Sequence, residues 1–324
     1  MSQSHRRGRA VGLALGYLAD VLWADPRRGH PVAAFGTAAA SLERVTYSDS
    51  RAAGVAHTGI LLGALGVLGV LAERAAARRG PRWTAAVTAA ATYVALGGTS
   101  LGRTGAAMAD FLDAGDVDGA RGLVPSLCGR DPQSLDEAGI ARATVESVAE
   151  NTADAQVAPL WWGAIGGAPG LLVYRGANTL DAMIGHMSPR LLHFGWAAAR
   201  FDDVANYLPA RVTGLLVATC APVVSGSPRA AVAAWRRDAA RHPSPNAGVV
   251  EASFAGALGV RLGGPTQYAH RLEIRPTLGE GQAPEVADVM RSVRLSRAVQ
   301  LAAAGIAVAV TAVGRSGRPA SARR

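Results

Sequence analysis

Long runs of apolar residues without a charged side chain constrain the fold of this chain more than any other feature. Three runs, 54–72, 83–102 and 298–314, contain no Asp, Glu, Lys or Arg. Each is close to the roughly 20 residues that a helix needs to cross the hydrocarbon core of a bilayer. Buried helices of a water-soluble core are the alternative, but three such runs in one chain favour an integral membrane protein.

The apolar runs extend to six candidate membrane segments. Proposed in chain order, these are 11–24, 54–72, 83–102, 155–174, 212–224 and 298–314. The first follows a basic start, but no small-residue cleavage site comes after it, so we expect an uncleaved helix. The fifth is short, and Pro222 limits its length.

Two of the six segments carry features that an ordinary membrane span avoids. The first contains Asp20, whose carboxylate must face protein or water. The fourth contains six glycines and prolines, a density tolerated at membrane depth only where the backbone is buried in protein or lines a cavity. We therefore predict that at least one of these two segments is a broken or re-entrant element.

The predicted fold class is all-α, a multi-pass integral membrane protein with broken or re-entrant segments. The polar stretches 134–151 and 230–241 have helical patterning and are expected to be amphipathic cytoplasmic helices. Residues 1–314 are predicted to form a single helical membrane domain. The remaining segment, 315–324, is basic and rich in small residues, and is expected to be a disordered tail.

The net charge of +9 comes from arginine alone, because the chain contains no lysine. This excludes a Schiff-base lysine and a P-loop lysine, and with them pyridoxal-phosphate enzymes and Walker-type ATPases. Much of the arginine flanks apolar segments, as in 74–82 and 315–324. That placement fits the positive-inside rule better than nucleic-acid binding, so no nucleic-acid partner is expected.

Acidic residues at helical spacing form the first candidate site. Arg142, Glu146 and Glu150 are four residues apart and share one helical face, with Asn151 and Asp154 at its end. Such a face could hold Mg²⁺, which takes one or two carboxylates and leaves its other positions to water and phosphate. A solvated ion pair between Arg142 and Glu146 is the simpler interpretation of this spacing.

A second acidic cluster, Asp202 and Asp203 with Asn206, lies between Arg200 and Arg211. Alone, it could be a helix cap with salt bridges. Several arginines could donate bidentate hydrogen bonds to phosphate or carboxylate oxygens, namely Arg27, Arg130, Arg175 and Arg200. His30, His186 and His193 are candidate general bases, although a lone histidine is more often a structural hydrogen-bonding group.

The polar blocks together resemble the CobD/CbiB family of cobalamin biosynthesis. The resemblance begins at Gly16-Tyr-Leu-Ala-Asp20, Asp25-Pro26 and His30-Pro31-Val32. It continues through Gly129-Arg-Asp131, Arg142-Ala-Thr-Val-Glu-Ser-Val-Ala-Glu-Asn151 with Asp154, Asn178-Thr-Leu-Asp181, Arg200 with Asp202-Asp203, Asn206, and Pro209-Ala-Arg211. It ends with Ser244-Pro-Asn-Ala-Gly248, Glu251 and 255–264. Matches in order over roughly residues 12–268 are far more specific than one short motif.

The resemblance implies an adenosylcobinamide-phosphate synthase of the cytoplasmic membrane. Such an enzyme forms an amide between adenosylcobyric acid and (R)-1-amino-2-propanol or its O-phosphate, driven by ATP with Mg²⁺. The implied partners are the corrinoid, the aminopropanol phosphate, the lipid bilayer and other cobalamin-assembly enzymes. A transporter or corrinoid-binding scaffold that uses the same polar blocks is the alternative, because broken helices are typical of transporters as well.

Site residues are carried onto the matched blocks of this chain. The candidate catalytic residues are Glu146, Glu150, Asn151, Asp181, Asp202 and Asp203. The candidate metal ligands are Glu146, Glu150 and Asp154, expected to converge with Asp202 or Asp203. The candidate substrate-binding residues are Asp25, Arg27, His30, Arg130, Asp131, Asn178, Arg200, Asn206, Arg211, Ser244, Asn246 and Glu251.

The positions of these blocks conflict with six simple membrane spans. With a cytoplasmic N-terminus, six spans place the basic loop 74–82 and the tail inside, as the positive-inside rule prefers. The same count places 25–31 and 129–154 outside, away from cytoplasmic ATP. A shared active site therefore requires that at least one segment does not cross the membrane.

Overall fold

The chain is almost entirely helical in the computed structural model, which describes residues 2–26, 29–186, 188–268 and 271–313. The α-helices are α1 (Gln3–Trp23), α2 (Pro31–Thr46), α3 (Arg51–Arg79), α4 (Pro81–Ala95), α5 (Gly98–Asp113), α6 (Val117–Leu123), α7 (Glu137–Thr152), α8 (Ala158–Leu180), α9 (Trp196–Cys220), α10 (Pro228–Asp238), α11 (Ala247–Leu258) and α12 (Val286–Val313). Two π-helical turns, η3 (Ala153–Val157) and η4 (Asp181–Gly185), flank α8, and short 3-10 turns are η1 (Val124–Ser126), η2 (Pro132–Ser134), η5 (Ala221–Val224) and η6 (Ala239–Arg241). The all-α membrane class is confirmed.

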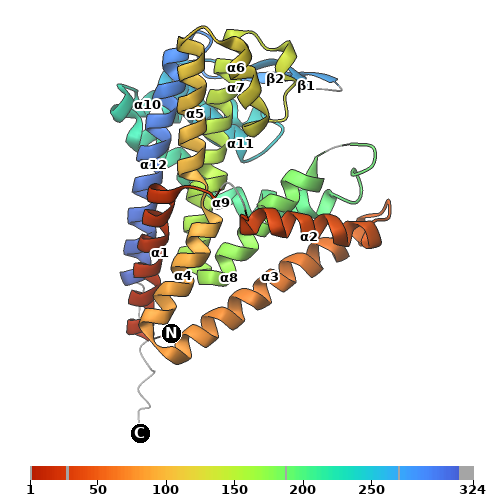
Figure 1. Cartoon of the computed structure of the whole chain (residues 1–324). Helices are drawn as coiled ribbons and strands as arrows, with labels where there is room; N and C mark the ends of the chain where they lie inside the picture. Colours follow the sequence, from red (N-terminus) through yellow and green to blue (C-terminus); the bar gives the residue numbers. More distant parts are fainter. Residues whose placement is uncertain (1, 27–28, 187, 269–270, 314–324) are drawn as a thin grey trace.

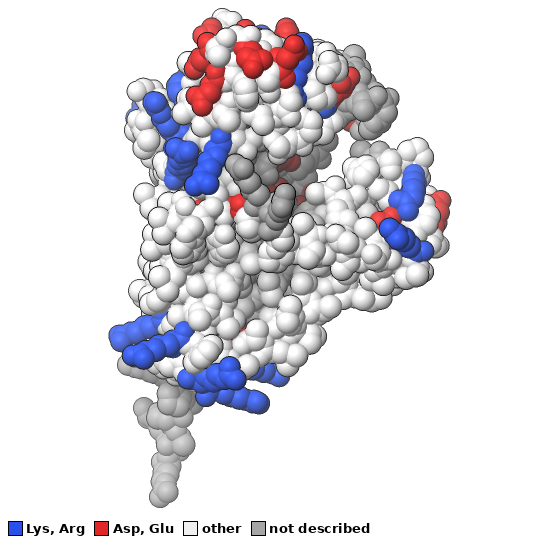
Figure 2. All heavy atoms as spheres, in the orientation of Figure 1, with Lys and Arg blue, Asp and Glu red and all other residues white. Residues whose placement is uncertain are grey.

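Four helical stretches among the described residues are long and apolar enough to cross a membrane. They are Arg51–Arg79, Glu137–Gly185, Trp196–Val224 and Val286–Val313. Figure 1 places the N-terminus and the α3–α4 turn at one end of the molecule, and α10, α11 and the two strands at the other. Arginine side chains gather at the first end and an uncharged band lies above them (Figure 2). This distribution is typical of a membrane protein with one water-facing lobe.

The prediction of one span over 83–102 is wrong. The helix breaks after Ala95, where Leu96 is extended and Gly97 has non-helical dihedral angles, so α4 and α5 are separate helices. Asp20 of α1 stabilises the break, because its Oδ2 accepts hydrogen bonds from the Thr99 backbone N–H at 3.1 Å and from the Thr99 hydroxyl at 2.9 Å. The buried carboxylate of Asp20 thus faces protein, and it caps the start of α5.

The breaker-rich segment 155–174 is a helical hairpin, as one of the two alternatives predicted. Gly167 has a φ of 63° and a ψ of −147° inside α8, a backbone conformation that glycine alone adopts readily. The chain reverses there, so that Gly170 packs on the carbonyl of Trp162 and the Tyr174 hydroxyl reaches the Asp154 carbonyl at 3.0 Å. The other suspect segment, 11–24, is continuous helix in α1 as far as Trp23.

The tip of this hairpin points to the arginine-rich end of the molecule. Arg9, near the start of α1, pairs with Glu73 of α3, and its guanidinium lies against Gly167. The open end of the hairpin, where Asp154 and Asp181 lie, therefore faces away from the arginine-rich end. The polar residues next to the hairpin are brought toward the water-facing lobe.

The largest hydrophobic core lies around α11, in which eleven of twelve residues are buried. A two-stranded antiparallel sheet, β1 (Leu262–Tyr268) and β2 (Arg271–Leu278), covers this region and pairs Thr266 with Glu273. Arg142 holds the sheet to α7 by donating to the carbonyls of Gly263 at 2.8 Å and Pro265 at 2.6 Å. The predicted tail 315–324 lies outside the described residues.

Candidate functional site

A cavity of about 190 Å³ at the open end of the hairpin collects most of the predicted acidic residues. We call it the acidic cavity. Its charged lining consists only of carboxylates, and its remaining polar lining consists of amides and a hydroxyl. The lining residues are Glu150, Ala153, Asp154, Asp181, Ala199, Asp202, Asp203, Asn206, Ser244, Asn246, Ala247 and Val250.

Four segments far apart in the sequence form this cavity. The end of α7 with η3, the start of η4, the first turns of α9 and the start of α11 each contribute. Glu146, Glu150 and Asp154 were predicted to converge with Asp202 or Asp203, and of these Glu150, Asp154, Asp202 and Asp203 line one cavity, whereas Glu146 does not. These residues form two separate clusters in the sequence, and the reversal of the chain at Gly167 brings them together.

Two amide side chains hold the acidic segment of α9, one by the Asp202 carboxylate and one by the Asp203 backbone. Asn206 is 1% exposed and donates its Nδ2 to Asp202 Oδ2 at 2.9 Å. Asn246 donates to the Asp203 carbonyl and accepts from Arg211, each at 2.8 Å. The hydroxyl of Ser244 accepts from the backbone N–H groups of Asn246 at 3.3 Å and Ala247 at 3.2 Å, which fixes the start of α11.

Oxygen ligands of this kind suit Mg²⁺, which binds carboxylates together with water and phosphate oxygens. Within the described residues, no group of three or more His, Cys, Asp or Glu side chains is arranged to hold a metal ion by itself. Asp154 is within electrostatic reach of Asp202 and Glu150. The cavity therefore offers one or two carboxylates to a cation whose other ligands come from solvent or substrate.

Glu146, predicted as a catalytic residue and metal ligand, lies outside the acidic cavity. It is 2% exposed and pairs with Arg130, and its other oxygen accepts the Gly263 backbone N–H at 2.7 Å. Arg275 of β2 is 3.7 Å from the same carboxylate. The exposed Arg142–Glu146 pair considered from the spacing is wrong, since Arg142 binds backbone carbonyls and Glu146 is buried.

Glu146 belongs to a buried network that we call the arginine layer, composed of Arg130, Glu146, His242, Glu251 and Arg275. Arg275 Nη2 is 2.8 Å from His242 Nε2 and 3.7 Å from Glu251 Oε1. Because an arginine only donates, His242 Nε2 must accept, and the imidazole is neutral. Burial and the neighbouring Arg275 lower the pKa of His242 to about 4. Burial raises the pKa of Glu251.

Asp25 and His30, both predicted to bind substrate, do not line the acidic cavity. His30 Nδ1 accepts from the Val32 N–H at 3.1 Å and caps α2, while its Nε2 is 3.2 Å from Asp25 Oδ1. Gly97 lies between Asp25 and Arg175, which in turn donates to Asn178 Oδ1 at 3.3 Å. Figure 2 shows a hollow between the lobe and the arm that contains α2.

Three other predicted residues serve local structure. Asn151 donates to the Ser147 carbonyl of its own helix at 2.9 Å, and Asp131 caps the 3-10 turn η2 by accepting from the Gln133 N–H. Arg200 donates to Asp203 Oδ2 at 3.2 Å with a side chain that is 66% exposed. Arg27 lies outside the described residues.

His242 and Arg275 were not predicted from the sequence. Arg275 is an ordinary strand residue with no motif around it, and its partner Glu146 is 129 residues away, so no spacing rule reveals the contact. A buried histidine in the segment before Ser244 could have been suspected only from its neighbouring polar block.

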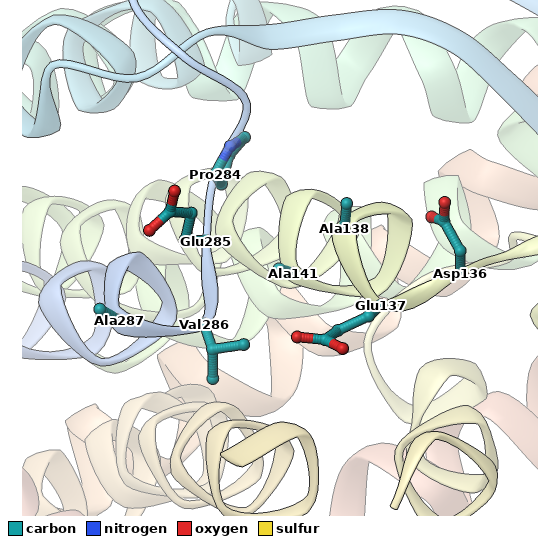
Figure 3. Close-up of a pocket in the computed structure, with 8 residues that line it drawn as sticks. All are labelled: Asp136, Glu137, Ala138, Ala141, Pro284, Glu285, Val286 and Ala287. Atoms are coloured by element: carbon teal, nitrogen blue, oxygen red, sulfur yellow. The ribbon is translucent and has the colours of Figure 1, made fainter. Parts of the chain in front are cut away.

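A larger cavity of about 540 Å³ between the starts of α7 and α12 contains none of the predicted site residues. Its acidic side chains are Asp136, Glu137 and Glu285. Figure 3 shows them spread along the opening without meeting at one point. Asp136 is already used as the N-cap of α7. The acidic cavity is therefore the better candidate for a reaction site.

The fold and the cavity define a helical membrane protein with a carboxylate-lined site beside its water-facing lobe. The family described as CobD/Cbib protein matches residues 13–296. The chain belongs to the CobD/CbiB family.

Curated relatives agree over nearly the whole chain. A protein of Mycobacterium tuberculosis (strain ATCC 25618 / H37Rv) named "Cobalamin biosynthesis protein CobD" is 63% identical over 300 residues, covering 93% of this chain and 95% of its own length. Proteins with the same name from Chromobacterium violaceum and Rhodobacter capsulatus are 43% and 42% identical, covering 88% and 89% of this chain and 91% and 90% of their own lengths. No solved structure matches.

Proposed function

We propose that this protein is a cobalamin-biosynthesis enzyme that joins (R)-1-amino-2-propanol, or its O-phosphate, to adenosylcobyric acid in an ATP-dependent amide-forming reaction. Its family and the name of its relatives support a role in cobalamin biosynthesis. The acidic cavity is the single observation that carries the proposed chemistry.

The lining of the cavity favours a small cation over an anion. Five carboxylates and no arginine line it, so its electrostatic potential is negative. An ammonium group of the amine substrate, or a Mg²⁺ ion, is stabilised there. Phosphate oxygens are repelled unless a cation accompanies them.

The volume of the cavity determines which of the substrates it can enclose. Pockets for drug-sized ligands have volumes of roughly 300–1,000 Å³, and a corrin with its side chains is larger than such ligands. A volume of about 190 Å³ holds an aminopropanol unit but no corrin. We therefore place the amine inside the cavity and the corrinoid over its mouth, with one propionate directed inward.

The reaction needs an activated carboxylate, because a carboxylate ion is a poor acyl donor. Transfer of the γ-phosphoryl group of ATP to a propionate oxygen gives an acyl phosphate and ADP. A carboxylate first takes one proton from the ammonium group, which frees the lone pair of the nitrogen. The amine nitrogen then attacks the carbonyl carbon, the phosphate leaves, and the second proton lost from nitrogen passes to another carboxylate. In this scheme Asp181 and Asp202 accept these protons, and Asp154 with Glu150 would hold Mg²⁺, whose charge would neutralise phosphate.

The direct test is product formation by the purified protein in detergent or nanodiscs. Adenosylcobyric acid, aminopropanol phosphate, ATP and Mg²⁺ are supplied, and adenosylcobinamide phosphate is measured by mass spectrometry. We expect product that requires all four components. Corrinoid binding without product, at any substrate concentration, would favour the transporter or scaffold alternative, which the hairpin break at Gly167 also fits.

We further propose that the protein lies in the cytoplasmic membrane with the acidic cavity open to the cytoplasm, where ATP is found. The arginines at the start of α1 and at the α3–α4 turn then lie on the outer side, against the positive-inside rule. Labelling of single cysteines at Ser244 and Arg78, with Cys128 and Cys220 replaced by serine, decides the orientation. Labelling of position 244 from outside would overturn the ATP-dependent function.

A further inference from the structure

A buried tyrosine lies directly behind the acidic cavity. Tyr174, on the returning arm of the hairpin, is 2% exposed, and its hydroxyl is 2.9 Å from Asn206 Oδ1 and 3.0 Å from the Asp154 carbonyl. Asn206 in turn donates to Asp202 Oδ2 at 2.9 Å. Tyr174 does not line the cavity, so it does not touch a substrate there.

The amide oxygen of Asn206 faces the Tyr174 hydroxyl, and the NH₂ group of the same amide faces Asp202. An asparagine side chain presents an oxygen acceptor on one side and an NH₂ donor on the other. With its oxygen toward the Tyr174 hydroxyl, the NH₂ group faces Asp202. The opposite rotamer would direct the amide oxygen at the carboxylate oxygen, which is repulsive in a buried position.

The hydroxyl also ties three elements together at the open end of the hairpin. Its single proton lies within hydrogen-bonding distance of two acceptors, the Asp154 carbonyl of the π-helical turn η3 and the Asn206 amide oxygen of α9. A π-helical turn frees backbone carbonyls from their regular partners, and π-turns are frequent at functional sites. The Tyr174 hydroxyl meets one such carbonyl next to the carboxylates.

From this geometry we propose that Tyr174 is a positioning residue for the reaction, acting through Asn206 to hold Asp202 in its place at the cavity wall. The proposal rests on the proposed function. It assigns no contact with the substrate to Tyr174, and the effect of Tyr174 on Asp202 passes through the Asn206 amide.

A double-mutant cycle on kcat tests this dependence. Tyr174→Phe removes the hydroxyl and keeps the ring, and we expect kcat to fall on the order of tenfold, as for the loss of one hydrogen bond to a fixed partner. KM for aminopropanol phosphate is expected to stay within about twofold of the wild type. In the Asn206→Ala background, Tyr174→Phe should lower kcat no further, because the group through which it acts is gone.

Trp162→Phe is the matched control, since Trp162 lies on the other arm of the hairpin and donates to the Ala205 carbonyl at 3.0 Å. It should leave kcat unchanged per folded protein. Independent, multiplying losses in the Tyr174→Phe/Asn206→Ala variant would overturn the proposal. So would an unchanged kcat in Tyr174→Phe.

A second variant keeps the proposal testable if the Tyr174→Phe protein does not fold. Fluorinated tyrosine at position 174 keeps the shape of the side chain and makes the hydroxyl a stronger donor, and kcat should change with the degree of fluorination. No change in kcat would overturn the proposal. A wild-type protein that forms no amide would instead remove the proposed function itself, so the two failures are distinguishable.

Discussion

Glu146 and Glu150 lie one turn apart on the same helix and belong to different environments. Glu146 is in the arginine layer, where Arg130, Arg275 and the Gly263 N–H meet its carboxylate. Glu150 lines the acidic cavity, in which every charged lining residue is an acid. The helix gives both residues the same face, and the surrounding elements give them opposite electrostatic partners.

This difference separates residues that hold the fold from residues that are available for chemistry. A buried carboxylate matched by arginine contributes to stability only as part of its pair, and removing one partner leaves an uncompensated charge. A set of carboxylates without cations is unfavourable for the free protein, and it becomes favourable when a cation binds. We therefore expect substitutions in the arginine layer to affect folding and substitutions in the acidic cavity to affect activity.

The largest effect is expected for the acidic cavity. Asp202→Asn and Asp181→Asn should each lower the rate of amide formation on the order of 10²- to 10⁴-fold, the contribution of a positioned proton acceptor. The amount of folded protein should change little. Asp118→Asn, at a carboxylate that is 91% exposed, is the control. If the cavity variants lose activity and the amount of folded protein equally, these carboxylates contribute to folding and not to the reaction.

The reverse outcome is expected for the arginine layer. Glu146→Gln leaves the buried Arg130 without its anion and should lower the free energy of unfolding by roughly 3–5 kcal/mol. Denaturant titration in detergent measures this, with Glu137→Gln as an exposed control on the first turn of the same helix. A stable Glu146→Gln protein that lacks only activity would move Glu146 back among the catalytic residues.

Sequence reasoning found the residues of the acidic cavity because charged and amide side chains are conspicuous beside apolar runs. It could not choose the partner of Glu146, because i,i+4 spacing suggested Arg142 while the fold supplies Arg130 and Arg275. Those contacts come from tertiary packing of the loop before η2, α7 and strand β2. Sequence periodicity contains no information on such long-range pairs.

The predicted membrane segments also include one break that the sequence indicated and one that it did not. The glycines and prolines of 155–174 correctly indicated a broken element, since they allow a reversal that other residues resist. The break in 83–102 was missed although Gly97-Gly98 is a breaker pair, because a Gly-Gly pair inside an apolar run does not by itself end a membrane span. The contact that holds the break comes from Asp20, 79 residues before Thr99, whose backbone N–H it accepts. A partner on another helix made that break favourable.

Acid should destabilise the arginine layer through His242. Its pKa is lowered from 6.5 to about 4 in the folded protein, so the unfolded chain binds the additional proton between these two values. The stabilisation is fully present above pH 6.5 and is lost as the pH falls toward 4, with a total of about 3 kcal/mol. The difference in free energy of unfolding between wild type and His242→Gln isolates this contribution from other titrating carboxyl groups. A pH-independent difference would mean that His242 is not held neutral.

The smallest effect is expected at the tip of the hairpin, far from both the arginine layer and the acidic cavity. Gly167→Ala forces a side chain into a conformation that only glycine adopts easily, and the new Cβ would lie 2.6 Å from Arg9 Nη2. We expect a loss of about 1–3 kcal/mol in the free energy of unfolding, with the rate of amide formation per folded protein unchanged. Gly166→Ala is the matched control, because an added Cβ there meets nothing within 4 Å. Thermal unfolding of both variants in detergent provides the comparison. Equal stability would mean that the chain does not reverse at Gly167, and without that reversal Glu150 and Asp154 would not meet Asp181 in one cavity.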